Sequence, residues 1–243
     1  MQHITTLFCR LAATTLALCI IAVFGSTALA ATVTVDSGGG GDSVTIGGGL
    51  ALAGPGDTVE VVDSATYNEF GLTVSTGVTL LSTQVPAPTI TLGLGFTLVS
   101  LDGGDIDGFS LTNSGFHLGP LTAPHIPALT NVVGGGDSEV RNCVFTSNEV
   151  GIQLVSGGGH VDIIDCTFNN NKVGLTTDSE FGLSASIQNC QFTFNGSNVT
   201  PGLFPNNGAV VIRSQGFNIT IDGCDFDFNE TVTPNLFFST IDA

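Results

Sequence analysis

Four cysteines of this chain share one local pattern and are the first residues that could carry chemistry. Each is followed by phenylalanine after two positions and by asparagine after five; they are Cys143, Cys166, Cys190 and Cys224. An even set of thiols could form disulfides or bind a metal. No histidine shares the pattern, and side chains that point the same way in a repeat have poor geometry for disulfides. We therefore expect small, buried, unpaired thiols.

A second group with chemical potential is acidic and lies near the end of the chain. Asp222, Asp225 and Asp227 are close in sequence, and alternation along a strand would point Asp225 and Asp227 outward together. Hard carboxylate oxygens of this kind suit a calcium ion. The simpler interpretation, which we favour, is a solvated acidic edge, and a calcium site stands as the alternative.

The elements that position these residues follow from the repeat. Successive cysteines are 23, 24 and 34 residues apart, a period typical of a solenoid. An earlier copy at Ile106 has Phe109 in place of cysteine. Cysteine and phenylalanine alternate with polar residues, as in a strand with one buried face, and asparagine suits a corner. No stretch after residue 30 shows a helical period. The sequence thus predicts an all-β, single-stranded parallel β-helix with roughly 22–24 residues per coil.

Stacked coils would place equivalent residues about 4.8 Å apart, which groups the repeated side chains into columns. The cysteines and phenylalanines would form inward columns, and the asparagines Asn148, Asn171, Asn195 and Asn229 would line a corner. Arg141 would lie beside Asp107 of the previous coil and form a modest ion pair. Lys172 follows a corner asparagine and is expected to be solvated.

Two coils are about ten residues longer than the others, so two loop insertions are expected. They fall within Gly115–Gly136 and Gly196–Asn207. The first contains His117 and His125; the second contains Pro201, Phe204 and Pro205. Loops on a rigid solenoid often carry function, so we expect any binding site near them.

The N-terminal thirty residues have the features of a signal peptide. An uncharged apolar stretch, Leu11 to Phe24, is followed by the small-x-small site Ala28-Leu29-Ala30. We expect residues 1–30 to be removed and residues 31–243 to form one secreted or cell-surface domain. Three basic residues against 21 acidic ones then leave a net charge of −18. This charge disfavours nucleic acid and anionic membranes as partners, and we expect a monomer without membrane insertion.

The repeats resemble the right-handed parallel β-helix proteins of the pectate-lyase-like superfamily. The segments Ala51–Val62 and Ala65–Glu69 are similar to the opening coil of many secreted members, and the resemblance covers roughly residues 32 to 243. In lyases of this superfamily a basic residue abstracts a proton beside calcium-binding carboxylates. The resemblance makes Arg213 the candidate base and Asp222, Asp225 and Asp227 the candidate calcium ligands. The nearest match to the polygalacturonase Gly-His-Gly segment is Gly159-His160-Val161, which lacks one glycine.

Three functions remain open from the sequence. We favour a non-catalytic secreted or cell-surface protein in adhesion or loose polysaccharide interaction. The first alternative is a polysaccharide lyase or related carbohydrate-active enzyme that acts on acidic polysaccharide. The second is a fragment of a larger surface adhesin. No cofactor other than calcium is suggested, and polysaccharide or cell-surface components are the expected partners.

Overall fold

The structure is a computed structural model of the whole chain, and it describes residues 29–91, 97–112, 126–131, 136–155, 159–178, 184–196, 208–212 and 218–229. The chain separates into two units, Met1–Ala30 and Ala31–Ala243, and every described strand lies in the second. Residues 1–28 of the expected signal peptide lie outside the described residues. In the described part, no helix is long and apolar enough to span a membrane.

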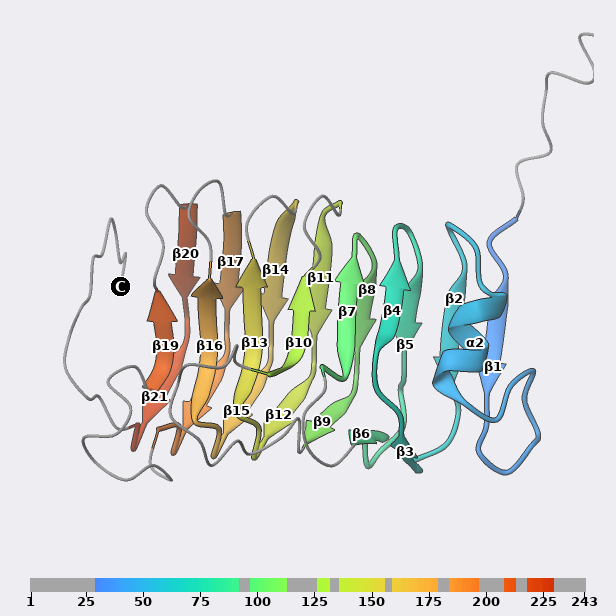
Figure 1. Cartoon of the computed structure of the whole chain (residues 1–243), viewed down its shortest axis with the longest axis horizontal. Helices are drawn as coiled ribbons and strands as arrows, with labels where there is room; N and C mark the ends of the chain where they lie inside the picture. Colours follow the sequence, from blue (N-terminus) through green and yellow to red (C-terminus); the bar gives the residue numbers. More distant parts are fainter. Residues whose placement is uncertain are drawn as a thin grey trace, which may run out of the picture. The chain divides into compact units, whose positions relative to one another are not determined.

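Three parallel sheets, here called A, B and C, run along the second unit (Figure 1). Sheet A contains β1 (Thr32–Val35), β2 (Thr58–Val61), β5 (Thr79–Leu81), β8 (Asp105–Asp107), β11 (Ser138–Arg141), β14 (His160–Ile164), β17 (Ser184–Gln188) and β20 (Asn218–Asp222). Sheet B contains β3 (Thr66–Asn68), β6 (Thr89–Thr91), β9 (Ser110–Thr112), β12 (Val144–Thr146), β15 (Thr167–Asn169), β18 (Gln191–Thr193) and β21 (Asp225–Asp227). Sheet C contains β4 (Leu72–Ser75), β7 (Val99–Asp102), β10 (Pro127–Asn131), β13 (Val150–Val155), β16 (Val173–Asp178) and β19 (Gly208–Ile212).

Each strand pairs with its equivalent one coil away, so the chain forms the expected single-stranded parallel β-helix. On sheet A, Val140 pairs with Ile163 and Ile163 with Ile187, which are the predicted steps of 23 and 24 residues. Earlier coils depart from this spacing, since Leu80 follows Val59 by 21 residues and precedes Ile106 by 26. These irregular coils extend the solenoid beyond the five copies visible in the sequence.

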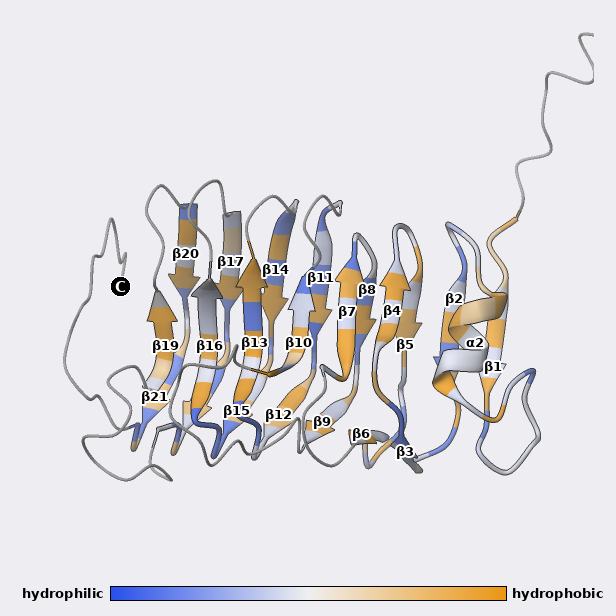
Figure 2. Ribbon diagram, in the orientation of Figure 1, coloured by the Kyte–Doolittle hydropathy of each residue, from blue (hydrophilic) through white to orange (hydrophobic). Residues whose placement is uncertain are grey.

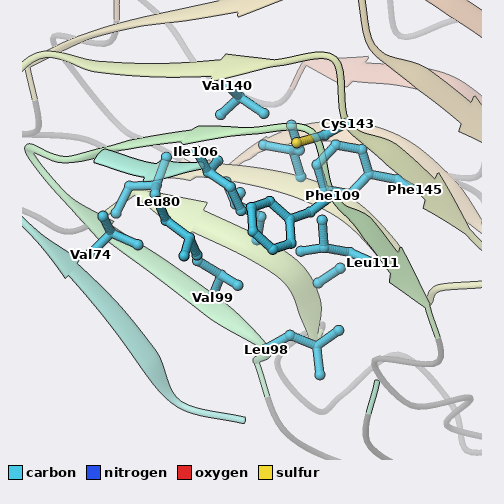
Figure 3. Close-up of a cluster of buried hydrophobic side chains, with 14 of the residues drawn as sticks. Val74, Leu80, Leu98, Val99, Ile106, Phe109, Leu111, Val140, Cys143 and Phe145 are labelled. Atoms are coloured by element: carbon cyan, nitrogen blue, oxygen red, sulfur yellow. The ribbon is translucent and has the colours of Figure 1, made fainter. Parts of the chain in front are cut away.

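One hydrophobic core fills the space enclosed by the three sheets. In the sheet B strands from β3 to β18, the central residue of each three-residue strand is buried. The residues on either side of it are partly or fully exposed. Figure 2 shows that hydrophobic residues recur in the strands of all three sheets. In Figure 3, Val74 and Val99 of sheet C, Ile106 of sheet A and Leu111 of sheet B gather in the same core. The alternation read from the repeat therefore places the core correctly.

The cysteine and phenylalanine columns form as expected through Cys190 and Phe192, and Phe226 of the last described coil continues the stack but is 46% exposed. Phe168 stacks on Phe145 and on Phe192 with ring centroids 4.9 and 4.5 Å apart. The four mature cysteines are free, and all except Cys224 are buried. Burial raises the pKa of the Cys143 thiol to about 12. A thiol that stays protonated at neutral pH is a poor nucleophile, so this column is part of the core.

The asparagine column forms a hydrogen-bonded ladder at the corner between sheets B and C. Asn171 Oδ1 accepts the backbone N–H of Asn148 at 3.0 Å, and Asn195 Oδ1 accepts that of Asn171 at 3.2 Å. The Asn171 amide also donates to the Phe145 carbonyl at 2.9 Å. Asn148, Asn171 and Asn195 are fully buried. Because each ladder step satisfies backbone groups of the adjacent coil, this corner locks successive coils in register.

A short helix, α2 (Ile46–Leu52), corrects the expectation that no helix would form. The Thr45 side chain caps it, and the Glu69 carboxylate accepts hydrogen bonds from its first two N–H groups at 2.7 and 2.8 Å. The helix lies beside β1, β2 and β4 at the N-terminal end of the solenoid (Figure 1). Gly49 packs so closely there that a β-carbon would meet Val35 at 2.6 Å. The helix therefore depends on tertiary contacts that helical periodicity does not reveal.

The two expected insertions both follow strands of sheet B. Their main parts, residues 113–125 and 197–207, connect β9 to β10 and β18 to β19 and lie outside the described residues. The loop residues singled out in the sequence, His117, His125, Pro201, Phe204 and Pro205, lie outside them as well. A binding site near these loops therefore stays a prediction.

Candidate functional site

The outward side of sheet A brings together three carboxylates from consecutive strands. Glu139 of β11 lies between Asp105 of β8 and Asp162 of β14. The backbone N–H of Glu139 donates to Asp105 Oδ1 at 2.8 Å. Side chains on alternate positions of a strand share one face, so these groups point away from the core. They form an acidic column on the outer surface, and we call it the sheet A acidic column.

Arg141 is held by this column, although its partner differs from the one expected. The guanidinium forms a two-point contact with Glu139, with Nε–Oε1 at 2.8 Å and Nη2–Oε2 at 2.9 Å. Arg141 does pair in register with Asp107, but that carboxylate accepts a hydrogen bond from the Asn142 amide instead. The expected Arg141–Asp107 ion pair is therefore replaced, because Glu139 lies two residues away on the same face.

Two carboxyl groups of the column have pKa values shifted in opposite directions. Burial raises the pKa of Asp105, and the charge of Glu139 adds to that shift while the hydrogen bond from the Glu139 N–H opposes it. The hydrogen bond from Arg141 lowers the pKa of Glu139. The same contact raises the pKa of Arg141, so its guanidinium stays protonated. Neighbouring acids with divergent pKa values are a known feature of functional sites, although ion-pair networks also produce them.

His160 extends the group to the next coils. Its Nδ1 lies 2.7 Å from Ser184 Oγ, and its Nε2 lies 3.3 Å from Asp162 Oδ1. The side chains of His160 and Asp162 are 38% and 39% exposed, so a ligand can reach both. His160 belongs to the segment Gly159-His160-Val161, which lacks one glycine of the Gly-His-Gly pattern, and the structure places it beside the sheet A acidic column.

A shallow hollow adjoins this face at the corner between sheets A and B. It has a volume of about 320 Å³, and Gln84, Asp107 and Asn142 are among the residues that line it. Amide and carboxylate groups can donate to and accept from ligand hydroxyls. The hollow lies next to the sheet A acidic column, because Asp107 ends β8 and Asn142 directly follows β11, the strand with which β8 pairs.

The expectation that Lys172 is solvated is wrong. Its side chain is 6% exposed, and Nζ lies 3.8 Å from Glu149 Oε1, whose side chain is 5% exposed. The other Glu149 carboxylate oxygen accepts the N–H of Ile126 at 3.4 Å. Glu149 and Lys172 each follow an asparagine of the ladder, so stacking brings them together at the inner side of that corner. Their burial makes this pair part of the scaffold.

The acidic group near the chain end does not gain a cation site from the described residues. Asp222 ends β20, Asp225 and Asp227 lie on β21, and all three are exposed. Arg213, the candidate base, lies outside the described residues. In the described part of the chain, no group of three or more His, Cys, Asp or Glu residues is placed to hold a metal ion. The roles of Arg213 and of the three aspartates stay predictions.

Two features of the surface were missed in the sequence. The sequence did not identify Asp105 and Glu139 as neighbours. Each directly precedes the same apolar position of its repeat, Ile106 or Val140, and this equivalence could have identified the pair. Exposed large aromatic side chains are the second feature that the sequence did not reveal. Phe70, Phe194, Phe226 and Phe228 are 50%, 46%, 46% and 75% exposed. Phe194 and Phe228 stack on each other outside the core with centroids 5.1 Å apart.

Comparison with known proteins supports the fold independently. A family model described as a right handed beta helix region matches residues 100–232, which include all four cysteine repeats. Neither the curated proteins nor the solved structures gave a match. The family match covers more than half of the chain and agrees with the three parallel sheets. The chain therefore belongs to the right-handed β-helix family.

Proposed function

We propose that this is a secreted or cell-surface β-helix protein that binds a hydroxyl-rich polysaccharide without cleaving it. The ligand would lie along the outward side of sheet A, on the sheet A acidic column and the adjoining hollow. Carboxylates accept hydrogen bonds from sugar hydroxyls, and the amides of the hollow both donate and accept. The signal peptide expected at residues 1–30 agrees with an extracellular ligand.

The condition of the two described basic side chains supports a non-catalytic role, and Arg213, the candidate base, lies outside the described residues. A lyase base must lose its proton before it can take one from the substrate. Of the three mature cations, the described ones are Arg141 and Lys172, and each is held by a carboxylate. The pKa of Arg141 is raised by its partner, and Lys172 is buried. Neither side chain is in a position to serve as the base of a lyase.

Charge further narrows the ligand class. The chain has 21 acidic and four basic residues, so a polyanionic polysaccharide would be repelled at low ionic strength. A neutral polysaccharide meets no such repulsion and can use the carboxylates as hydrogen-bond acceptors. We therefore favour neutral chains over uronic-acid polymers, which the lyase alternative would require.

Affinity electrophoresis through gels containing neutral or acidic polysaccharides tests the proposal. We expect a neutral polysaccharide to retard the mature protein, and Asp162→Asn combined with His160→Ala to remove that retardation. Ser100→Ala, an outward change on sheet C, is the matched control and should bind as the wild type does. Equal retardation of all variants, or no retardation by any neutral polymer, would contradict binding at this face.

A carbohydrate-active enzyme is the second candidate, and one observation favours it. Asp105 and Glu139 are neighbours whose pKa values move apart, which is the usual arrangement for an acid and a base. Release of reducing ends would reveal hydrolysis, and absorbance of unsaturated products would reveal elimination. Activity that Asp105→Asn abolishes would replace the binding proposal with this one. Absence of both signals on every retained polysaccharide would support binding alone.

A further inference from the structure

The outward side of sheet B presents an uncharged and regular set of side chains. From β3 to β18 every outward residue is neutral, and most are threonine, serine or asparagine. One column contains Thr66, Thr89, Ser110, Val144, Thr167 and Gln191. The second contains Asn68, Thr91, Thr112, Thr146, Asn169 and Thr193. We call these twelve residues the sheet B array.

The array is regular in two directions because it lies on one parallel sheet whose strands pair in register. Neighbouring strands are about 4.8 Å apart, and two outward residues of one strand are separated by about 6.6 Å. Six consecutive strands therefore present the columns over roughly 24 Å. Val144 interrupts the hydroxyls but has nearly the shape of threonine, so it preserves the surface contour. The strands β3 and β6, which the sequence did not reveal, supply a third of the array.

The polar groups of the array make no hydrogen bonds within the described structure. No side-chain hydroxyl or amide among these twelve described residues has a protein partner, although all are partly or fully exposed. Sheet A differs, because its Ser186 accepts from Gln188 at 2.7 Å and its Ser184 bonds His160. Hydroxyls without a protein partner must bond to water or to a ligand.

Neutrality of the array is unusual for this chain. The formal net charge is −17, yet the first acidic residues on the outward side of sheet B are Asp225 and Asp227 of the last described strand. Charged groups hold strongly oriented hydration shells, whereas hydroxyl and methyl groups leave the first water layer free to follow their own spacing. A repeated, uncharged surface therefore favours a ligand that is itself periodic and built from water.

From this geometry we propose that the sheet B array binds the surface of ice. Water molecules held by the free hydroxyls and between the threonine methyls would match the lattice in two directions. A polysaccharide fits this face less well, because none of the twelve side chains of the array is an aromatic ring that could stack on a sugar. The proposal concerns a different face from sheet A and does not depend on polysaccharide binding.

Thermal hysteresis and inhibition of ice recrystallisation test the proposal on the mature protein. We expect both activities in the wild type and their loss in Thr112→Lys and Thr146→Lys, which place a long charged chain at the centre of the array. Ser100→Lys on sheet C adds the same charge elsewhere and should retain both activities. Far-ultraviolet circular dichroism and the unfolding midpoint of each variant establish that the fold is intact.

Two outcomes would overturn the proposal. The first is absence of both activities in the folded wild type. The second is equal activity in the wild type and in folded Thr112→Lys and Thr146→Lys, which would place ice binding elsewhere. A sedimentation assay with powdered crystalline cellulose or chitin distinguishes the competing ligand. Retention of the wild type on either powder, lost in the same two variants without any ice activity, would assign the array to a polysaccharide.

Discussion

Two ion pairs of this molecule use similar residues in very different surroundings. Glu139 and Arg141 lie two residues apart on one strand, and their side chains are 39% and 35% exposed. Glu149 and Lys172 come from adjacent coils, and their side chains are 5% and 6% exposed. The exposed pair makes the closer contact, at 2.8 Å against 3.8 Å. Contact distance alone therefore does not rank the two pairs.

Burial decides what each pair contributes. Water screens the exposed pair, so its net effect on the free energy of unfolding is small. Removal of one partner from the buried pair leaves a desolvated charge, which costs far more than the pair gains over apolar residues. The exposed pair on sheet A is therefore accessible to a ligand, whereas the buried pair has a structural role at the ladder corner.

The largest difference should appear on removal of Lys172. We expect Lys172→Met to lower the free energy of unfolding by about 3 to 5 kcal/mol, because Glu149 would be left buried without its cation. Urea denaturation of the mature protein measures this change. The double variant Lys172→Met with Glu149→Leu should recover most of the loss. A single variant as stable as the wild type would mean that water or a rearrangement solvates Glu149.

The neighbouring ladder gives the next largest effect. Asn171→Ala removes the acceptor for the Asn148 N–H and the donor to the Phe145 carbonyl, and both groups are buried. We expect a loss of about 2 to 4 kcal/mol, since unsatisfied buried groups keep their desolvation cost. Asn171→Asp is the informative partner, because it keeps the acceptor oxygen and loses the donor. Equal stability of both variants would show that loss of the donor, together with the charge that aspartate brings into the buried corner, costs as much as loss of the whole amide.

The parts of this structure that sequence reasoning found are those where the repeat is chemically constant. Cys143, Phe145 and Asn148 recur in the same order, so the columns and the corner could be placed from spacing alone. The earlier coils lack the cysteine and the corner asparagine of the repeat and step by 21 and 26 residues, so Val59 and Leu80 did not align with later copies. Helix α2 was missed because its glycines hide the periodicity and its caps include the distant Glu69.

The candidate site was less predictable because it depends on contacts between coils. Lys172 looks exposed when only its own coil is considered, and its burial follows from Glu149 of the previous coil. The register did contain that information, since both residues directly follow a ladder asparagine. Arg141 illustrates a different limit: the register with Asp107 was right, yet a side chain on the same strand supplied the ion partner. Register predicts neighbours, and side-chain reach chooses between them.

The exposed Glu139–Arg141 pair contributes little to the free energy of unfolding, but it should make that free energy depend on pH. The pKa of Glu139 is lowered by Arg141, so its stabilising effect is present above the ordinary glutamate pKa and is lost as the pH falls through the lowered value. Arg141→Gln should remove this effect and lower stability at pH 7 by less than about 1 kcal/mol, after allowance for solvent screening. The difference between variant and wild type should shrink below pH 4. An undiminished difference at low pH would show that Arg141 acts through packing.

The smallest effect on the free energy of unfolding is expected on sheet B. The test compares a hydroxyl that has no hydrogen bond within the described part of the protein with one that has such a bond. Thr112→Val keeps the shape of the side chain and removes a hydroxyl that has no protein partner among the described residues. Surface changes of this kind alter the free energy of unfolding by no more than about 0.5 kcal/mol. Ser184→Ala on sheet A is the matched comparison, because it breaks the 2.7 Å contact with His160 Nδ1 and should cost more. If Thr112→Val proved the more destabilising of the two, the hydroxyls of the sheet B array would be structural, and their availability to a ligand would no longer follow.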